Sequence, residues 1–260
     1  MLLLQITDTH LYQDKQRTLL GVNTFSSFSE TIALVERSQW DLDLILATGD
    51  LVHDASENGY QALAQTLTSF SVPVYCLPGN HDKPSVMQQH LNADNVSCPL
   101  FVDQKGWRLI LLDSVLAGSE GGHFTEQEIQ RLEKALIDAP EHVLISMHHQ
   151  PVAVGSRWLD TMQVDNAEEF WKVVDRHLDK VRCVLWGHIH QKFEDKRGDI
   201  HLIGSPSTCV QFTPEQDDFG VDAIPPGLRL INLGDDGSVS TEVVRLDNLP
   251  EGLDAESAGY

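Results

Sequence analysis

The sequence is poor in basic residues. Lys and Arg together number 18 against 39 Asp and Glu in a chain of 260 residues, which gives a formal net charge of -21. This surplus repels nucleic-acid backbones and anionic membrane surfaces, so we expect neither as a partner. A small anionic substrate would meet the same repulsion unless bound cations reversed the field locally.

Cysteine and long hydrophobic runs are also scarce. The four cysteines, Cys76, Cys98, Cys183 and Cys209, show no Cys-x-x-Cys spacing, so we expect buried free thiols of the kind found in a reducing compartment. No stretch approaches 18 apolar residues, and the first residues lack the basic segment of a secretory signal. The sequence therefore predicts a cytoplasmic protein that crosses no membrane, and it leaves the oligomeric state open.

Apolar, strand-like runs alternate with helical segments over the first 190 residues. Residues 2–7, 42–48 and 72–77 read as strands, and Thr125 with Glu128 forms a capping box that opens a helix. Beyond residue 200 the pattern changes to consecutive strands. The sequence therefore predicts an α/β fold of two mixed β-sheets packed face to face and flanked by helices. We expect one domain over residues 1–246, followed by a loose acidic tail at 247–260.

Five of the strand-like runs end in residue types that bind metal ions. The segments are Asp8-Thr9-His10, Gly49-Asp50, Gly79-Asn80-His81-Asp82, His148-His149 and Gly187-His188-Ile189-His190. Each pattern alone is common, but five with the same placement are hard to ascribe to chance. In open α/β sheets the functional residues collect outside the carboxyl ends of the strands. Residues far apart in the sequence are therefore predicted to line one cleft.

The chemistry of these residues points to a pair of metal ions. Asp8 and His10 are two residues apart, as are His188 and His190, so an extended backbone would turn both members of each pair to the same side. Carboxylate, imidazole and amide oxygen together suit divalent first-row metals, and the lack of thiolates argues against a structural zinc site. About seven ligands are too many for one ion, whereas two ions about 3.5 to 4 Å apart can share a carboxylate.

The five segments resemble, in order, the motifs of the calcineurin-like metallophosphoesterase family, which has a four-layer αββα sandwich. The resemblance implies that Asp8, His10 and His190 hold one metal ion and that Asn80, His148 and His188 hold the second. It implies that Asp50 bridges the two ions and that His81 protonates the leaving oxygen. It also implies that the substrate contacts five residues of the centre, namely His10, Asp50, Asn80, His81 and His190. Fe or Mn is favoured as the metal, with Zn or Co as alternatives.

Further stretches resemble the bacterial class III cyclic nucleotide phosphodiesterases. They include Leu20-Gly21-Val22-Asn23-Thr24, Trp158-Leu159-Asp160 and residues 206–212. This resemblance implies that the enzyme hydrolyses a small cyclic nucleotide, 3',5'-cyclic AMP, to 5'-AMP. Because metal ions lower the pKa of a bound water to near 7, a metal-bound hydroxide would attack phosphorus. Alternatives are another small diester, such as a glycerophosphodiester or a 2',3'-cyclic nucleotide, and a non-catalytic scaffold with the same fold.

Some residues around the predicted centre keep more than one interpretation. Adjacent strand residues face opposite ways, so only one of His148 and His149 can point at the metals, and the family pattern favours His148. His149 would then line the pocket or support the ligands. His53 and His123 are candidates for substrate contact without an assigned role. The glycines at 49, 79 and 187 are expected where the backbone approaches the metals too closely for a Cβ.

Overall fold

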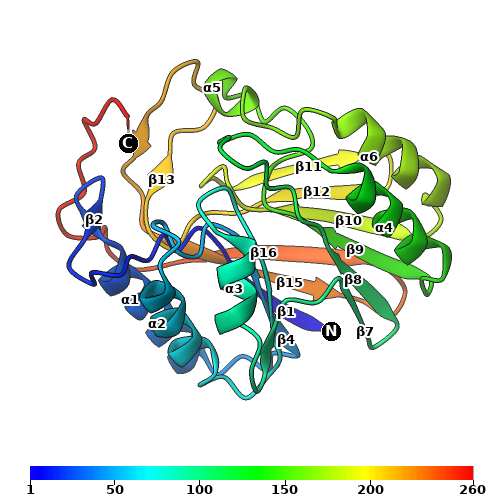
Figure 1. The fold of residues 1–260 in the computed structure, drawn as a ribbon, viewed down its shortest axis with the longest axis horizontal. Helices are drawn as coiled ribbons and strands as arrows, with labels where there is room; N and C mark the ends of the chain where they lie inside the picture. The colour runs from blue at the N-terminus through cyan, green and yellow to red at the C-terminus, as the bar shows by residue number, and fades with distance from the viewer. Residues whose placement is uncertain (260) are drawn as a thin grey trace.

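The structure, a computed structural model, describes residues 1–259 and consists mainly of two six-stranded sheets (Figure 1). The first sheet has the order β16 (Val239–Arg245), β15 (Gly227–Leu233), β1 (Leu2–Ile6), β4 (Leu44–Thr48), β5 (Val74–Leu77) and β6 (Val96–Ser97). Its strands β1, β4, β5 and β6 are parallel, whereas β15 runs antiparallel to both of its neighbours, β1 and β16.

The second sheet has the same mixed character. Its order is β11 (Phe193–Arg197), β12 (Ile200–Gly204), β10 (Val181–Trp186), β9 (His142–Ser146), β8 (Trp107–Leu111) and β7 (Phe101–Gln104). The four inner strands are parallel, and the edge strands β7 and β11 are antiparallel to their neighbours. Two short hairpins pair β2 (Thr18–Leu19) with β3 (Val22–Asn23) and β13 (Gln211–Phe212) with β14 (Val221–Asp222).

Helices cover the outer faces of both sheets (Figure 1). The first sheet carries α1 (Thr24–Ser38), α2 (Glu57–Leu67) and α3 (Pro84–His90), and the second carries α4 (Glu126–Ile137) and α6 (Ala167–Val174). The short α5 (Arg157–Asp160) and the 3-10 helix η1 (Asp175–His177) lie in connections. Because the sheets pack face to face between the helices, the predicted arrangement of two mixed sheets flanked by helices is confirmed.

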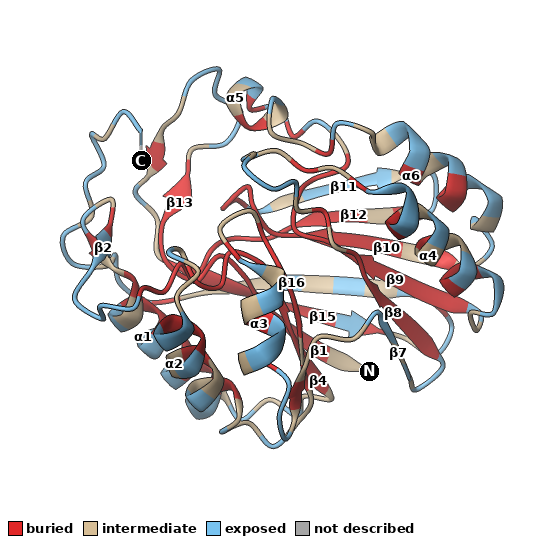
Figure 2. Ribbon diagram, in the orientation of Figure 1, coloured by how far each residue is buried: buried red, intermediate tan, exposed pale blue. Residues whose placement is uncertain are grey.

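The apolar core follows the alternation of side chains along the strands. Leu4 and Ile6 of β1 pack beneath the helices of the first sheet, whereas Leu3 belongs to a separate cluster between the two sheets. That cluster also contains Trp107 and Leu144 of the second sheet. The buried strands run through the middle of the molecule (Figure 2). The two sheets are therefore held together by a continuous apolar interface, which fixes their strand ends relative to one another.

The structure differs from the sequence-based expectation at the sheet edges and at one cap. Strands β7 and β11 were not predicted because edge strands are polar, and β11 reads Phe-Glu-Asp-Lys-Arg. The predicted capping box is only half formed. Thr125 accepts from the Glu128 amide at 3.1 Å, but the Glu128 carboxylate accepts from Asp113 N at 2.9 Å. A longer-range partner therefore replaces the local one.

The four cysteines are free thiols, and three are buried as expected, but Cys98 is half-buried. None of the helices among residues 1–259 has the length and apolar character needed to span a membrane. Past β16 the chain runs to residue 259 as turns and coil, and Asp254 N donates to Leu20 O at 2.9 Å. The division between a domain and a tail at residue 246 stays a prediction.

Candidate metal centre

The five predicted segments meet where the carboxyl ends of strands from both sheets come together. Asp8 and His10 follow β1, Asp50 follows β4, and Asn80 with His81 follows β5. His148 follows β9 in the second sheet, and His188 and His190 follow β10. Within this region, ligand atoms of Asp8, His10 and His190 lie within 4.8 Å of one another, as do those of Asp8, Asp50 and His148. Each of these two groups combines residues from both sheets.

Backbone carbonyls orient two of the histidine rings. His148 Nδ1 lies 2.9 Å from Thr48 O, and His190 Nδ1 lies 2.9 Å from Val210 O. A carbonyl can only accept, so Nδ1 must carry the proton in both rings. In the neutral form of either ring, the Nε2 lone pair would point into the centre, where His190 Nε2 lies 3.3 Å from Asp8 Oδ1. This is the tautomer that a metal ligand requires.

Three buried polar atoms in the centre have no hydrogen-bond partner among the described residues. They are Asn80 Oδ1, His148 Nε2 and His188 Nε2. Buried polar groups without partners are costly and call for an explanation such as an ion. These three residues are the set that the family pattern assigns to the second metal ion. The donor types and the unpartnered atoms therefore fit a divalent cation.

The electrostatics of the centre couple His148 to Asp50. His148 Nε2 lies 3.3 Å from Asp50 Oδ2. Burial disfavours a charged imidazole, but the Asp50 carboxylate outweighs it and raises the pKa of His148 to about 9. Burial together with the neighbouring His148 lowers the pKa of His188 to about 3. Because a metal ligand must be an unprotonated imidazole, binding of a cation would release the proton of His148.

The extended backbone expected at Asp8 and His10 and at His188 and His190 is wrong. Asp8, His10, Asp50, His188 and His190 all have positive φ angles, at 54°, 44°, 49°, 63° and 48°. The backbone of these residues is in the left-handed region rather than extended. The left-handed conformation costs non-glycine residues free energy, and such residues cluster at functional sites. Asp8 and His10 still share one group, but His188 and His190 fall into different ones. The chain turns sharply at each ligand instead of continuing the strand.

His149 is engaged elsewhere, although its ring packs beside His148 and His188 and the three could form a ligand group. Its Nδ1 lies 2.8 Å from Ser114 Oγ, and its Nε2 lies 3.2 Å from Glu120 O. Both ring nitrogens of His149 therefore have partners, whereas Nε2 of His148 faces Asp50. This geometry supports the choice of His148 as the ligand and gives His149 a supporting place.

The structure leaves no room for a Cβ at the three glycines, and the closeness of their backbone to metal ions stays a prediction. A Cβ at Gly49 would lie 2.3 Å from His148 Nδ1, and one at Gly187 would lie 2.1 Å from Thr7 Oγ1. A Cβ at Gly79 would lie 2.3 Å from Asp50 Oδ1 and 2.8 Å from His148 Nε2. Each glycine thus lets the backbone of one segment touch a side chain of another.

We expect Gly79→Ala to lower the free energy of unfolding by about 1–3 kcal/mol and to weaken metal binding, because the added methyl displaces Asp50. Thermal unfolding and Mn²⁺ titration of the purified variant measure the two effects. Gly121→Ala is the matched control, since its Cβ would make an ordinary contact at 3.4 Å with Met162. Unchanged Mn²⁺ affinity in Gly79→Ala would contradict the proposed closeness of this backbone to the metals.

Asp82 ties two of the ligand segments together, a role that the sequence analysis did not assign. Its carboxylate accepts from Leu51 N at 3.0 Å, Val52 N at 3.1 Å and Gly79 N at 2.9 Å, and from the Tyr60 hydroxyl at 2.7 Å. Burial and the charge of Asp50 raise the pKa of Asp82 to about 6. Its four donors hold the segment after β4 against the segment after β5. The sequence signal was the position of Asp82 within the Gly79-Asn80-His81-Asp82 segment. A carboxylate buried there needs several hydrogen-bond donors.

Tyr60→Phe should lower the free energy of unfolding by about 1–3 kcal/mol, because a buried hydrogen bond to Asp82 is lost. The same hydroxyl also accepts from Lys83 N at 3.1 Å, so two groups lose a partner. Urea denaturation of the metal-free protein measures the change. Tyr75→Phe, at a partly exposed tyrosine of β5, serves as control and should stay within about 0.5 kcal/mol of wild type.

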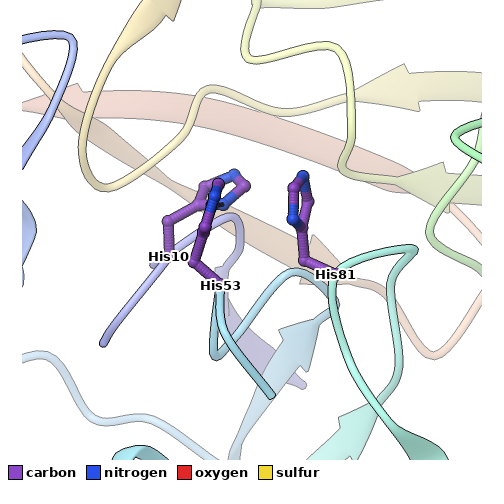
Figure 3. Close-up of side chains that lie close together, drawn as sticks. All are labelled: His10, His53 and His81. Carbon is purple, nitrogen blue, oxygen red and sulfur yellow. Dashed lines mark hydrogen bonds between the residues drawn. The ribbon is translucent and has the colours of Figure 1, made fainter. Parts of the chain in front are cut away.

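His53 and His123 lie in different surroundings. The His53 ring stacks on His81, with centroids 4.1 Å apart and an interplanar angle of 22°, beside His10 (Figure 3). His123 is partly exposed and pairs with Asp165 at 2.6 Å.

A further feature near the centre is aromatic. The ring of Phe212 stacks on His190, with centroids 4.2 Å apart, and Trp158 contacts Phe212 edge to face. The stretches at 158–160 and 206–212, which carry the resemblance to the cyclic nucleotide phosphodiesterases, therefore meet beside the candidate ligand His190.

Comparison with known proteins defines the class. Residues 1–192 match the calcineurin-like phosphoesterase family, and the chain belongs to that family. It is 37% identical to the 3',5'-cyclic adenosine monophosphate phosphodiesterase CpdA of Pseudomonas aeruginosa over 100% of this chain and 95% of that protein. Its identity to CpdA of Escherichia coli strain K12 is 40%, over 99% and 94% of the two chains. A dimetal phosphatase from Danio rerio shares the fold, with a TM-score of 0.61, 17% identity and coverage of 94% and 98%.

Proposed function

We propose that the chain is a metal-dependent phosphodiesterase that hydrolyses 3',5'-cyclic AMP to 5'-AMP. The observation that carries the proposal is the meeting of Asp8, Asp50 and His148 with His10 and His190 at the joined strand ends. The relatives named as cyclic AMP phosphodiesterases support the substrate, because they align with nearly the whole chain. The substrate is a small anion, and a centre holding cations would offset the repulsion from the acidic surface.

The roles that we propose follow the family pattern, and the cluster of Asp8, His10 and His190 and the unpartnered atoms of Asn80, His148 and His188 support them. Asp8, His10 and His190 hold one divalent ion, and Asn80, His148 and His188 hold the other, with Asp50 between them. Two such ions would lower the pKa of a bound water to near 7 and polarise the phosphoryl oxygens. The mixed oxygen and nitrogen donors suit Fe or Mn, with Zn or Co as alternatives.

The residues around the centre position the reacting groups. His10, Asp50, Asn80, His81 and His190 line the place where the phosphoryl group would lie. Hydrolysis adds water across the bond between phosphorus and the 3' oxygen, so the departing oxygen must gain a proton. His81 is half-buried beside the centre, and its amide donates to Asp50 Oδ1 at 2.9 Å. We assign the protonation of the 3' oxygen to its ring.

We also propose that the protein works in the cytoplasm. Its four free cysteines support this location, because a reducing compartment keeps thiols unpaired. The acidic surface makes nucleic acids and anionic membranes poor partners at long range.

The test of the proposed function uses metal-stripped protein to which Mn²⁺ or Fe²⁺ is added back. Hydrolysis of 3',5'-cyclic AMP is measured beside bis(p-nitrophenyl) phosphate, an undemanding diester. We expect turnover of both substrates and its loss with a chelator. Turnover of the artificial diester alone would remove cyclic AMP as the substrate, and a panel of small diesters compared by kcat/KM would then find the better one. Silence on both would favour a non-catalytic scaffold.

A further inference from the structure

The ring of His53 contacts both a proposed metal ligand, His10, and the proposed acid, His81 (Figure 3). Its Nδ1 is 2.9 Å from Nδ1 of His10. On its other side, the ring stacks on His81 at 4.1 Å. The rings of His10 and His81 also contact each other, with centroids 5.0 Å apart, so the three imidazoles form one cluster.

The hydrogen bond to His10 has a defined direction if His10 is a ligand. His10 Nε2 is the atom that faces the centre, lying 3.2 Å from His190 Nε2 and 3.7 Å from Asp50 Oδ2. When Nε2 of a neutral ring offers its lone pair, Nδ1 carries the proton and donates it. His53 Nδ1 must then accept. His53 thus accepts a hydrogen bond from Nδ1 of His10, as the carbonyls of Thr48 and Val210 accept from Nδ1 of His148 and His190.

His53 itself is firmly held. Its amide donates to Leu11 O at 2.7 Å. Tyr12, which is only 7% exposed, also packs against the ring, with centroids 4.7 Å apart. The His53 ring therefore packs against both Tyr12 and His81, and a shift of His53 would disturb its stacking on His81.

We propose that His53 is a positioning residue with two separable effects. Its Nδ1 fixes the tautomer and orientation of His10, and its ring face fixes the rotamer of His81. The inference rests on the proposed function, since it takes His10 as a ligand and His81 as the acid. Partners that orient a metal-bound histidine in this way affect metal affinity or activity by about 10- to 100-fold.

Two substitutions separate the effects. In His53→Asn the amide oxygen can stand where Nδ1 stands, so the acceptor is kept and the stacking ring is lost. In His53→Phe the ring is kept and the acceptor is lost. His53→Ala removes both, and His177→Phe, in η1 far from the strand ends, controls for loss of a histidine.

The readouts are calorimetric titration of metal-stripped protein with Mn²⁺ and kcat for cyclic AMP at saturating Mn²⁺. For His53→Phe we expect the Mn²⁺ Kd to rise about 10- to 100-fold, with kcat within about threefold of wild type. For His53→Asn we expect Kd within about threefold and kcat lower by about 10- to 100-fold, because His81 is misplaced. His53→Ala should show both losses.

Several outcomes would overturn the inference. Wild-type Mn²⁺ affinity in His53→Phe would remove the role toward His10, and wild-type kcat in His53→Asn would remove the role toward His81. Three Mn²⁺ per wild-type chain, falling to two in His53→Ala, would make His53 a ligand instead. A wild-type protein that binds Mn²⁺ but does not hydrolyse cyclic AMP would count against the proposed function. The Mn²⁺ titrations would still test the effect of His53 on His10.

Discussion

Replacing Asp50 by Asn should lower kcat/KM by at least about 10³-fold, because the carboxylate that we propose to bridge two cations would lose its charge at nearly constant shape. Asp50 lies at the middle of the centre. Its Oδ2 is 3.3 Å from His148 Nε2 and 3.7 Å from His10 Nε2, and its Oδ1 accepts from His81 N. An amide can occupy the same space but offers one neutral oxygen in place of two sharing a negative charge. One metal ion would be lost or both would bind weakly.

Kinetics with metal analysis of the same samples distinguishes these cases. Asp54→Asn is the matched control, because Asp54 is an exposed carboxylate on the same loop that accepts from Gln13 N and Ser56 N. It should keep activity within about threefold, as expected of a surface substitution. If Asp50→Asn retained two metal ions and kcat/KM within tenfold of wild type, the assignment of Asp50 as the bridge would be wrong.

His81→Ala should lower kcat for cyclic AMP by about 10²- to 10⁴-fold, the contribution of one general acid. The 3' oxygen of ribose is a poor leaving group and needs a proton as the bond to phosphorus breaks. p-Nitrophenolate is a stable anion and does not. We therefore expect the loss on bis(p-nitrophenyl) phosphate to be much smaller than the loss on cyclic AMP.

Measuring both substrates with the metals bound separates protonation from other roles of this ring. Equal losses on the two diesters would indicate that His81 stabilises charge on the phosphoryl group rather than protonating the leaving oxygen. A loss below tenfold on cyclic AMP, with Mn²⁺ content unchanged, would remove His81 from the proposed mechanism. Mn²⁺ content is the necessary control, since the His81 amide also donates to Asp50.

The sequence was sufficient for the architecture because the signals involved are local. Apolar runs marked the inner strands, and the metal-binding residue types at their ends indicated which edges of the sheets would meet. The edge strands β7 and β11 carried no such signal, because half or more of their residues face solvent. Strand order was also beyond the sequence, since it depends on pairings between distant segments.

At the centre, residue types were predictable, but the means of holding them was not. The left-handed turns at Asp8 and His190 arise from packing around them, and no local rule places a histidine there. The carbonyl of Val210 that orients His190 belongs to a backbone group, which has no sequence signature. Tyr60 lies on the buried face of α2, and no local sequence pattern predicts the hydrogen bond that its hydroxyl donates to Asp82.

The proposed ligands come from both halves of the sandwich, with Asp8, His10, Asp50 and Asn80 on one side and His148, His188 and His190 on the other. Cations bound there would link the two sheets at the carboxyl ends of their strands. A ligand at a hundred times its Kd stabilises the folded state by about 2.7 kcal/mol, so loading would slow unfolding and proteolysis. The amount of this protein in a cell should therefore rise and fall with the supply of its metal, through turnover of the chain rather than through its synthesis.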